Sequence, residues 1–94
     1  MQPYRNRLKI IADLLSAALN SNAEGGVSPS VLMRRSNLSY KGLERFLTQL
    51  LTAGFLMAKR EERGVRYVVS AKGCEYLEHY HQFETFAESF GLVL

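Results

Sequence analysis

The sequence predicts a mainly α-helical domain that contains one small β-hairpin. Ser28 and Ser39 each precede a stretch with helical periodicity, and a serine hydroxyl can accept hydrogen bonds from the free amides of a first helical turn. After Gly54 the apolar period shortens from 3.6 residues to about two, as strands require. Ser70 then precedes a last helical stretch. This order of elements predicts a winged helix-turn-helix with a long C-terminal helix.

The first helix is expected over residues 4–20. Its apolar side chains recur every three or four residues along one face: Leu8, Ile11, Leu14, Leu15 and Ala18. Burying a large aliphatic side chain stabilises a fold by roughly 1.5–3 kcal/mol. We therefore expect this helix to support the helix-turn-helix, and the polar, glycine-containing residues 21–26 to form a loop.

The helix-turn-helix is expected over residues 28–54. Pro29 suits the first helical position, where its missing N–H has no cost. Asn37 and Leu38 make the turn, and Gly54 ends the second helix. The apolar stripe of the second helix comprises Leu43, Phe46, Leu47, Leu50 and Leu51, and its opposite face carries Lys41, Arg45, Thr48 and Thr52, with Glu44 at the margin. For this stretch alone, the alternative is a plain helical hairpin in a bundle.

A hairpin is expected directly after the second helix, where it would form the wing. Residues 61–64 supply its turn, and Gly64 can take the positive φ that a three- to five-residue loop usually needs. Three arginines surround the tip: Arg60, Arg63 and Arg66. Such arginines can reach phosphates or a narrow minor groove. The alternative is a solvated turn, because Glu61 and Glu62 dilute the local charge.

The last helix is expected over residues 71–90. Aromatic or small residues recur at spacings of four and three in a heptad seam: Tyr76, Tyr80, Phe83, Ala87 and Phe90. So many aromatics in one narrow row exceed what a small domain easily buries, so we expect the seam to bind a second copy of the chain. The alternative is that this helix packs on the first helix of its own chain.

The charges divide the chain of 94 residues into a basic body and an acidic tail. All 12 Lys and Arg lie within residues 1–72, whereas residues 73–94 contain four acids and no Lys or Arg. This division favours an anionic polymer as the partner of the basic body. The alternative is that the uneven distribution of charge arose by chance. We expect residues 1–72 to be a winged helix-turn-helix DNA-binding domain and residues 73–94 a C-terminal dimerisation helix, within one structural domain.

Other classes of protein find little support in the sequence. We expect no enzyme and no cofactor, because no nucleophile–base constellation and no glycine-rich phosphate loop occur. Cys74, Glu78 and His81 share a helix face, but positions i to i+7 span roughly 10 Å, so no metal site is expected. One cysteine suits a reducing compartment. Without an export leader or a long apolar run, we expect a cytoplasmic, nucleoid-associated protein and no membrane partner.

Two segments of the chain resemble a known family. NLSYKGLERFLTQLLTAGFL and YVVSAKGCEYLEHY are similar to small archaeal winged helix-turn-helix proteins, typified by the abundant chromatin-type DNA-binding protein of crenarchaea. That family shows Leu-Ser-Tyr at the recognition helix and Tyr-x-Leu-Thr-x-x-Gly after the wing. The matching residues are Leu38, Ser39 and Tyr40, then Tyr67, Val69, Ser70 and Gly73, with Val for Leu and Ser for Thr. The resemblance implies that a long last helix pairs two protomers in an antiparallel coiled coil.

Together these observations predict a homodimeric protein that binds double-stranded DNA, as a sequence-dependent transcriptional regulator or as an architectural protein. We expect the helix after Ser39 to enter the major groove. The predicted DNA contacts are Arg34, Arg35, Ser39, Tyr40, Lys41, Arg45, Thr48, Arg60, Arg63 and Arg66. For Tyr40, at the edge of the apolar stripe, core packing is the alternative. The alternative for the whole protein is a protein-interaction module that docks through its apolar C-terminal helix.

Overall fold

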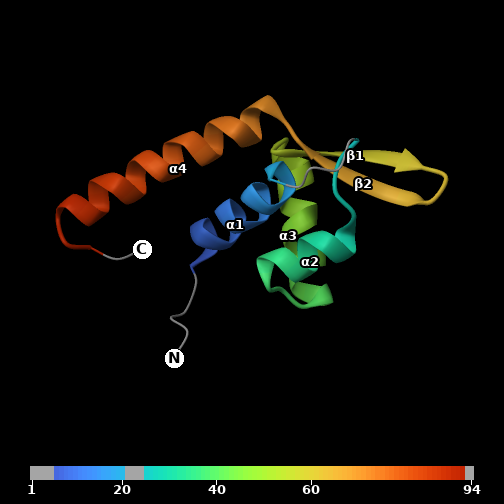
Figure 1. Ribbon diagram of the computed structural model, residues 1–94, viewed down its shortest axis with the longest axis horizontal. Coiled ribbons are helices and arrows are strands. Elements are labelled where there is room, and N and C mark those ends of the chain that lie inside the picture. Colours follow the sequence, from blue (N-terminus) through green and yellow to red (C-terminus); the bar gives the residue numbers. More distant parts are fainter. Residues whose placement is uncertain (1–5, 21–24, 93–94) are drawn as a thin grey trace.

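The computed structural model describes residues 6–20 and 25–92. Within these ranges the elements are α1 (Arg7–Leu19), α2 (Pro29–Ser36), α3 (Tyr40–Ala53), β1 (Leu56–Glu61), β2 (Gly64–Val69) and α4 (Ala71–Ser89). The helices α1, α2 and α3 gather in a bundle, from which the hairpin extends on one side and α4 on the other (Figure 1). This architecture confirms the predicted winged helix-turn-helix with a C-terminal helix.

Side-chain caps set where the helices begin. The hydroxyls of Ser28, Ser39 and Ser70 accept from the backbone N–H three residues later, as predicted. The side chain of Asn6 caps α1 in the same way, so α1 starts at Arg7. The predicted start at residue 4 lies outside the described residues. Local hydrogen bonding therefore decides all four starts.

Three helices end in the same motif, with one residue in the left-handed conformation. These residues are Asn37, Gly54 and Gly91, with φ of 56°, 82° and 77°. In each case the next amide donates to the carbonyl five residues back: Leu38 to Met33 at 3.1 Å, Phe55 to Leu50 at 2.9 Å and Leu92 to Ala87 at 2.9 Å. The predicted turn at Asn37 and Leu38 and the predicted end at Gly54 are confirmed.

The hairpin is tighter than predicted. Leu56 pairs with Val69 at its base and Glu61 with Gly64 at its tip, so the turn has two residues rather than three to five. A further bridge, missed in the sequence, joins Val27 to Tyr67 through two N–H···O bonds of 2.9 Å. A single bridge leaves no periodic pattern by which it could be predicted. It pins the segment before α2 to the edge of the wing.

The core lies where α1 meets α2, α3 and the base of the hairpin. Its largest fully buried side chains are Leu14, Leu15, Val27, Leu32, Leu43, Leu50 and Leu56. Leu8 was predicted to belong to this core, which is wrong, because its side chain is 49% exposed. Burial on α1 is confined to its middle, and both Leu8 and Leu19 at its ends face solvent.

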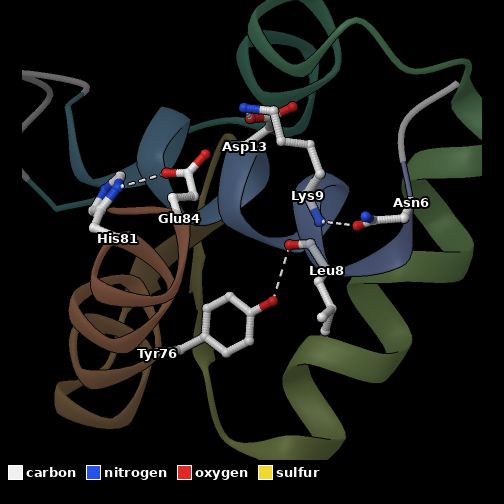
Figure 2. A network of polar contacts seen from close by, with 7 residues as sticks. All are labelled: Asn6, Leu8, Lys9, Asp13, Tyr76, His81 and Glu84. Carbon is white, nitrogen blue, oxygen red and sulfur yellow. Dashed lines mark hydrogen bonds and ion pairs between the residues drawn. The ribbon is translucent and has the colours of Figure 1, made fainter. Parts of the chain in front are cut away.

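The first half of α4 packs against its own chain. Tyr80 is buried, and the Tyr76 hydroxyl donates to the Leu8 carbonyl of α1 at 2.9 Å (Figure 2). Burial raises the pKa of Tyr80, and the negative charge of Glu84 raises it further. The Tyr80 hydroxyl has no hydrogen-bond partner within the described ranges. The predicted heptad seam is therefore narrower than expected, because Tyr76, Tyr80 and the buried Ala87 are not available to a partner.

The start of α4 is locked to the end of α3 by a close backbone approach. The Ser70 N–H donates to the Phe55 carbonyl at 3.0 Å, and the Ser70 hydroxyl donates to the Gly54 carbonyl at 2.5 Å. Gly73 is buried beside them, where a Cβ would overlap the Phe55 carbonyl and lie 2.7 Å from Cγ1 of Val69. Any larger residue at this position must push the two helices apart.

We predict that Gly73→Ala lowers the free energy of unfolding by about 1–3 kcal/mol, the usual cost of overpacking. Chemical denaturation followed by circular dichroism measures this change. Cys74→Ala is the matched control, because Cys74 is the next residue on α4 and is exposed. Its effect should stay within about 0.5 kcal/mol. Equal stability of the two variants would mean that the close approach does not constrain the fold.

Candidate nucleic-acid interface

The helix α3 presents one polar face to solvent. Its exposed residues include Lys41, Glu44, Arg45, Thr48 and Thr52, whereas Leu43, Leu47 and Leu50 are buried. This is the division that the sequence predicted, with Phe46 and Leu51 half-buried between the two faces. Among the residues that the structure describes, no side chain forms a hydrogen bond or ion pair with the charged groups of Lys41 or Arg45. Both cations are therefore free to bind a ligand.

The N-terminus of α3 forms one end of this face. The Ser39 hydroxyl accepts from the Gly42 amide at 3.1 Å, so its role in the structure is that of a cap. Tyr40 is 67% exposed, which excludes the core packing that the sequence left open. A helix N-terminus also carries partial positive charge and favours anions.

A cleft of about 280 Å³ lies between α3 and β2. Tyr40, Glu44 and Thr48 line it from α3, and Val65 and Tyr67 line it from β2. The exposed face of α3 and one face of the wing therefore border the same hollow and form a continuous surface.

The pairing of the strands decides which wing residues share this surface. Directly paired residues of an antiparallel hairpin lie on the same face, and successive residues alternate. Arg60 pairs with Val65, which lines the cleft, so Arg60 lies on the side of α3. Lys59 pairs with Arg66 on the opposite face.

Arg66 is occupied by contacts within the protein. Its Nη1 donates to the Gly26 carbonyl at 3.1 Å, and its Nε lies 3.5 Å from Oε2 of Glu61. In the described part of the chain, the exposed Arg60 and Arg63 have no such partner. The predicted group of three wing arginines therefore divides: Arg60 and Arg63 are available to a ligand, and Arg66 holds the segment before α2 against the hairpin.

The two arginines of α2 are exposed in its last turn, where the helix dipole favours cations. Arg35 borders a polar hollow that it shares with Asp13, Ser16 and Asn20 of α1. Arg35 therefore lies toward α1, at the edge of the surface formed by α3 and the wing.

Two further cations support α3, and neither role was predicted from the sequence. Lys72 Nζ donates to the Ala53 carbonyl at 2.7 Å and lies 5.2 Å from the centre of the Phe55 ring. Arg7 donates to the side-chain amide of Gln49 and so joins α1 to α3. A long basic side chain carries no sequence signal for such a distant partner.

Other kinds of site find no support in the part of the chain that is described. No cluster of three or more His, Cys, Asp or Glu side chains there could hold a metal ion. His81 Nδ1 instead lies 3.2 Å from Oε1 of Glu84 on α4 (Figure 2). None of the described helices combines the length and the apolar character that a membrane span needs.

Comparison with known proteins agrees with this geometry. A family model described as winged helix-turn-helix matches residues 4–88. The chain belongs to the winged helix-turn-helix family. A comparison with curated protein sequences gives no match.

Solved structures of other proteins share the fold. Sso10a-2, a DNA-binding protein from Sulfolobus solfataricus, superposes with a TM-score of 0.77 at 23% identity, covering 92% of this chain and 85% of its own. TubR from Bacillus thuringiensis serovar israelensis, bound to 24 bp of tubC, gives a TM-score of 0.63 at 22% identity, with 85% and 98% covered. The zinc-dependent MarR-family regulator AdcR gives 0.51 at 17% identity, with 95% and 65% covered.

We predict that Arg66→Ala lowers the free energy of unfolding by about 1 kcal/mol, because it removes a hydrogen bond to a partly buried carbonyl. Arg60→Ala is the matched control on the neighbouring strand and should change stability by less than about 0.5 kcal/mol. Thermal denaturation of both variants measures the difference. If Arg60→Ala were the more damaging of the two, the assignment of Arg66 as the supporting arginine would be wrong.

Proposed function

We propose that this winged helix-turn-helix protein binds double-stranded DNA, with α3 in the major groove and the hairpin against the adjacent backbone. The observation that carries the proposal is the continuous surface of α3 and the hairpin, on which Lys41, Arg45 and Arg60 stand exposed, with Arg63 exposed in the hairpin turn. None of these four cations has a partner within the described residues. Unpaired cations of this kind neutralise phosphates and release counterions, which is the main source of affinity for DNA. Two of the similar structures are DNA-binding by description: Sso10a-2, and TubR bound to tubC.

Within this proposal, the side chains divide by their distance from the bases. Lys41, Arg45 and Thr48 lie on the exposed face of α3 and reach base edges or nearby phosphates. Tyr40 and the amides behind the Ser39 cap contact the backbone at the helix N-terminus. Arg34 and Arg35 of α2 add phosphate contacts at the edge of the site, and Arg66 supports the wing from behind.

We further propose that two copies associate through the second half of α4. Phe83, Phe86 and Phe90 are 47%, 59% and 69% exposed there, and Leu92 beyond them is 57% exposed. Residues 73–94 carry no Lys or Arg, so this segment repels DNA and leaves its apolar strip for protein contact. Two-fold symmetry would then present two α3 helices to one duplex, about 34–36 Å apart if they enter successive major grooves.

The protein then acts in the cytoplasm on the nucleoid, as a transcriptional regulator or an architectural protein, without enzymatic activity. The same exposed phenylalanines also favour a second candidate, a protein-interaction module that docks another protein through α4. Absence of duplex binding at low salt, with a partner protein retained through α4, would decide for this second candidate.

The test of DNA binding is its salt dependence. We expect log K for a duplex to fall steeply with log salt, by about 0.9 for each phosphate contact. Replacing both Arg60 and Arg63 by Ala should reduce this slope by about 1.8, because two phosphate contacts are lost. Fluorescence anisotropy of a labelled duplex over a range of salt concentrations measures the slope.

Arg66→Ala is the control for that experiment. It removes the same charge from the same hairpin, but from a guanidinium that already binds Gly26 and Glu61. Its slope should therefore match that of the wild type. An unchanged slope in the variant that lacks Arg60 and Arg63 would remove the wing from the DNA interface.

The test of the dimer is the pair Phe83→Glu and Phe90→Glu. The double variant places four carboxylates in a two-fold apolar seam and should sediment as a monomer. Its fold should persist, because both rings are largely exposed within one chain. Affinity for DNA should fall as the linked second site is lost.

A matched variant places the same charges elsewhere on α4, with Glu at Cys74 and Thr85, which are exposed on the opposite side of the helix. It should remain a dimer. Wild-type protein that sediments as a monomer at micromolar concentration would refute the seam.

A further inference from the structure

The DNA-facing side of α3 carries one acid. Glu44 lies between Lys41 and Arg45 in the sequence of the helix and is exposed. Its carboxylate forms no hydrogen bond or ion pair with any residue in the ranges 6–20 and 25–92, although both cations are nearby. A free carboxylate at this place needs an explanation, because phosphates surround the face that carries it in the proposed complex.

A carboxylate can only accept hydrogen bonds, and so can a phosphate. Glu44 therefore opposes any complex in which it meets the DNA backbone. In the major groove, however, cytosine N4 and adenine N6 present amino groups, which are the only donors on the base edges. Among the groups that DNA offers in the major groove, only one of these amino groups can satisfy Glu44.

The position of Glu44 strengthens this discrimination. Its side chain borders the cleft between α3 and β2, whose lining includes Leu47, Leu51 and Val65. When bound DNA covers this cleft, its apolar lining strengthens a hydrogen bond that is made and raises the cost of a charge left unpaired. The difference between a matched and a mismatched base is therefore larger here than on an open surface.

The next turn of α3 also offers a hydrogen-bond acceptor, at Thr48. The Thr48 hydroxyl donates to the Glu44 carbonyl at 3.1 Å, so its proton is already used and its oxygen remains an acceptor. Glu44 and Thr48 thus offer two acceptors one helical turn apart on the side of the wing, while Lys41 and Arg45 offer donors.

We propose that Glu44 makes this protein sequence-selective by accepting a hydrogen bond from the amino group of cytosine or adenine in the major groove. This inference rests on the proposed function and deepens it. Lys41, Arg45 and the wing bind any duplex. Glu44 weakens binding to every duplex that lacks an amino group opposite its carboxylate.

The experiment is selection of bound duplexes from a random library, followed by sequencing and by anisotropy titration of the selected and scrambled duplexes. The proteins are the wild type, Glu44→Ala, Glu44→Gln and the control Glu78→Ala, which removes an exposed acid from α4. Every base pair carries one such amino group, on one strand or the other, so we expect the wild type to enrich one base pair, in one orientation, at one position. Glu44→Ala should reduce that preference by about 5- to 150-fold and bind scrambled duplexes more tightly.

The two remaining variants sharpen the result. Glu44→Gln should move the preference toward adenine, which a glutamine amide recognises through N6 and N7 together. Glu78→Ala should keep the wild-type preference, because α4 lies away from the DNA.

Three outcomes would overturn the inference. If Glu44→Ala binds all duplexes more tightly with the wild-type preference intact, Glu44 is only repulsive. If the wild type binds duplexes without enriching any base, the protein binds DNA without sequence selectivity. The proposed DNA-binding function then holds, and the inference about Glu44 fails. If the wild type binds no duplex at low salt, both the inference and the proposed function fail.

Discussion

The backbone hydrogen bond from Ser70 to Phe55 is the constraint on which the arrangement of the other elements depends. It closes the base of the hairpin at the point where α3 has just ended and α4 is about to begin. The missing side chain of Gly73 lets the first turn of α4 press against the same carbonyl. The helix α3, the hairpin and the helix α4 are thereby joined at one point.

The wing shows how strand geometry gives different roles to residues of the same type. Arg60 and Arg66 carry the same charge on neighbouring strands, but alternation places them on opposite faces. Arg66 meets the Gly26 carbonyl and Glu61 and becomes part of the scaffold. Arg60 is exposed and has no hydrogen bond or ion pair with the described residues. Net charge alone therefore overstates how many cations the body can offer to a polyanion.

Local chemistry made much of this fold predictable from the sequence. Serine caps, the turn at Asn37 and the polar face of α3 all depend on residues within one or two helical turns. The remaining features depend on distant partners. Heptad spacing cannot tell whether Tyr80 packs on its own chain or on another. Strand alternation likewise cannot tell that Arg66 meets the Gly26 carbonyl and Glu61. Which exposed side chains contact a ligand is not encoded in any local pattern.

The first half of α4 is packed against the core, and its second half extends beyond the core. Its tyrosines are held against α1, whereas its phenylalanines lie further along the helix, beyond that contact, and are exposed. Because an α-helix turns about 100° per residue, the angle between these two groups depends on the count of residues from Tyr80 to Phe83. Inserting or deleting one residue there would swing the aromatic strip around the axis while leaving the core intact. The geometry of assembly in such proteins can thus evolve through helical phase, without any change in composition.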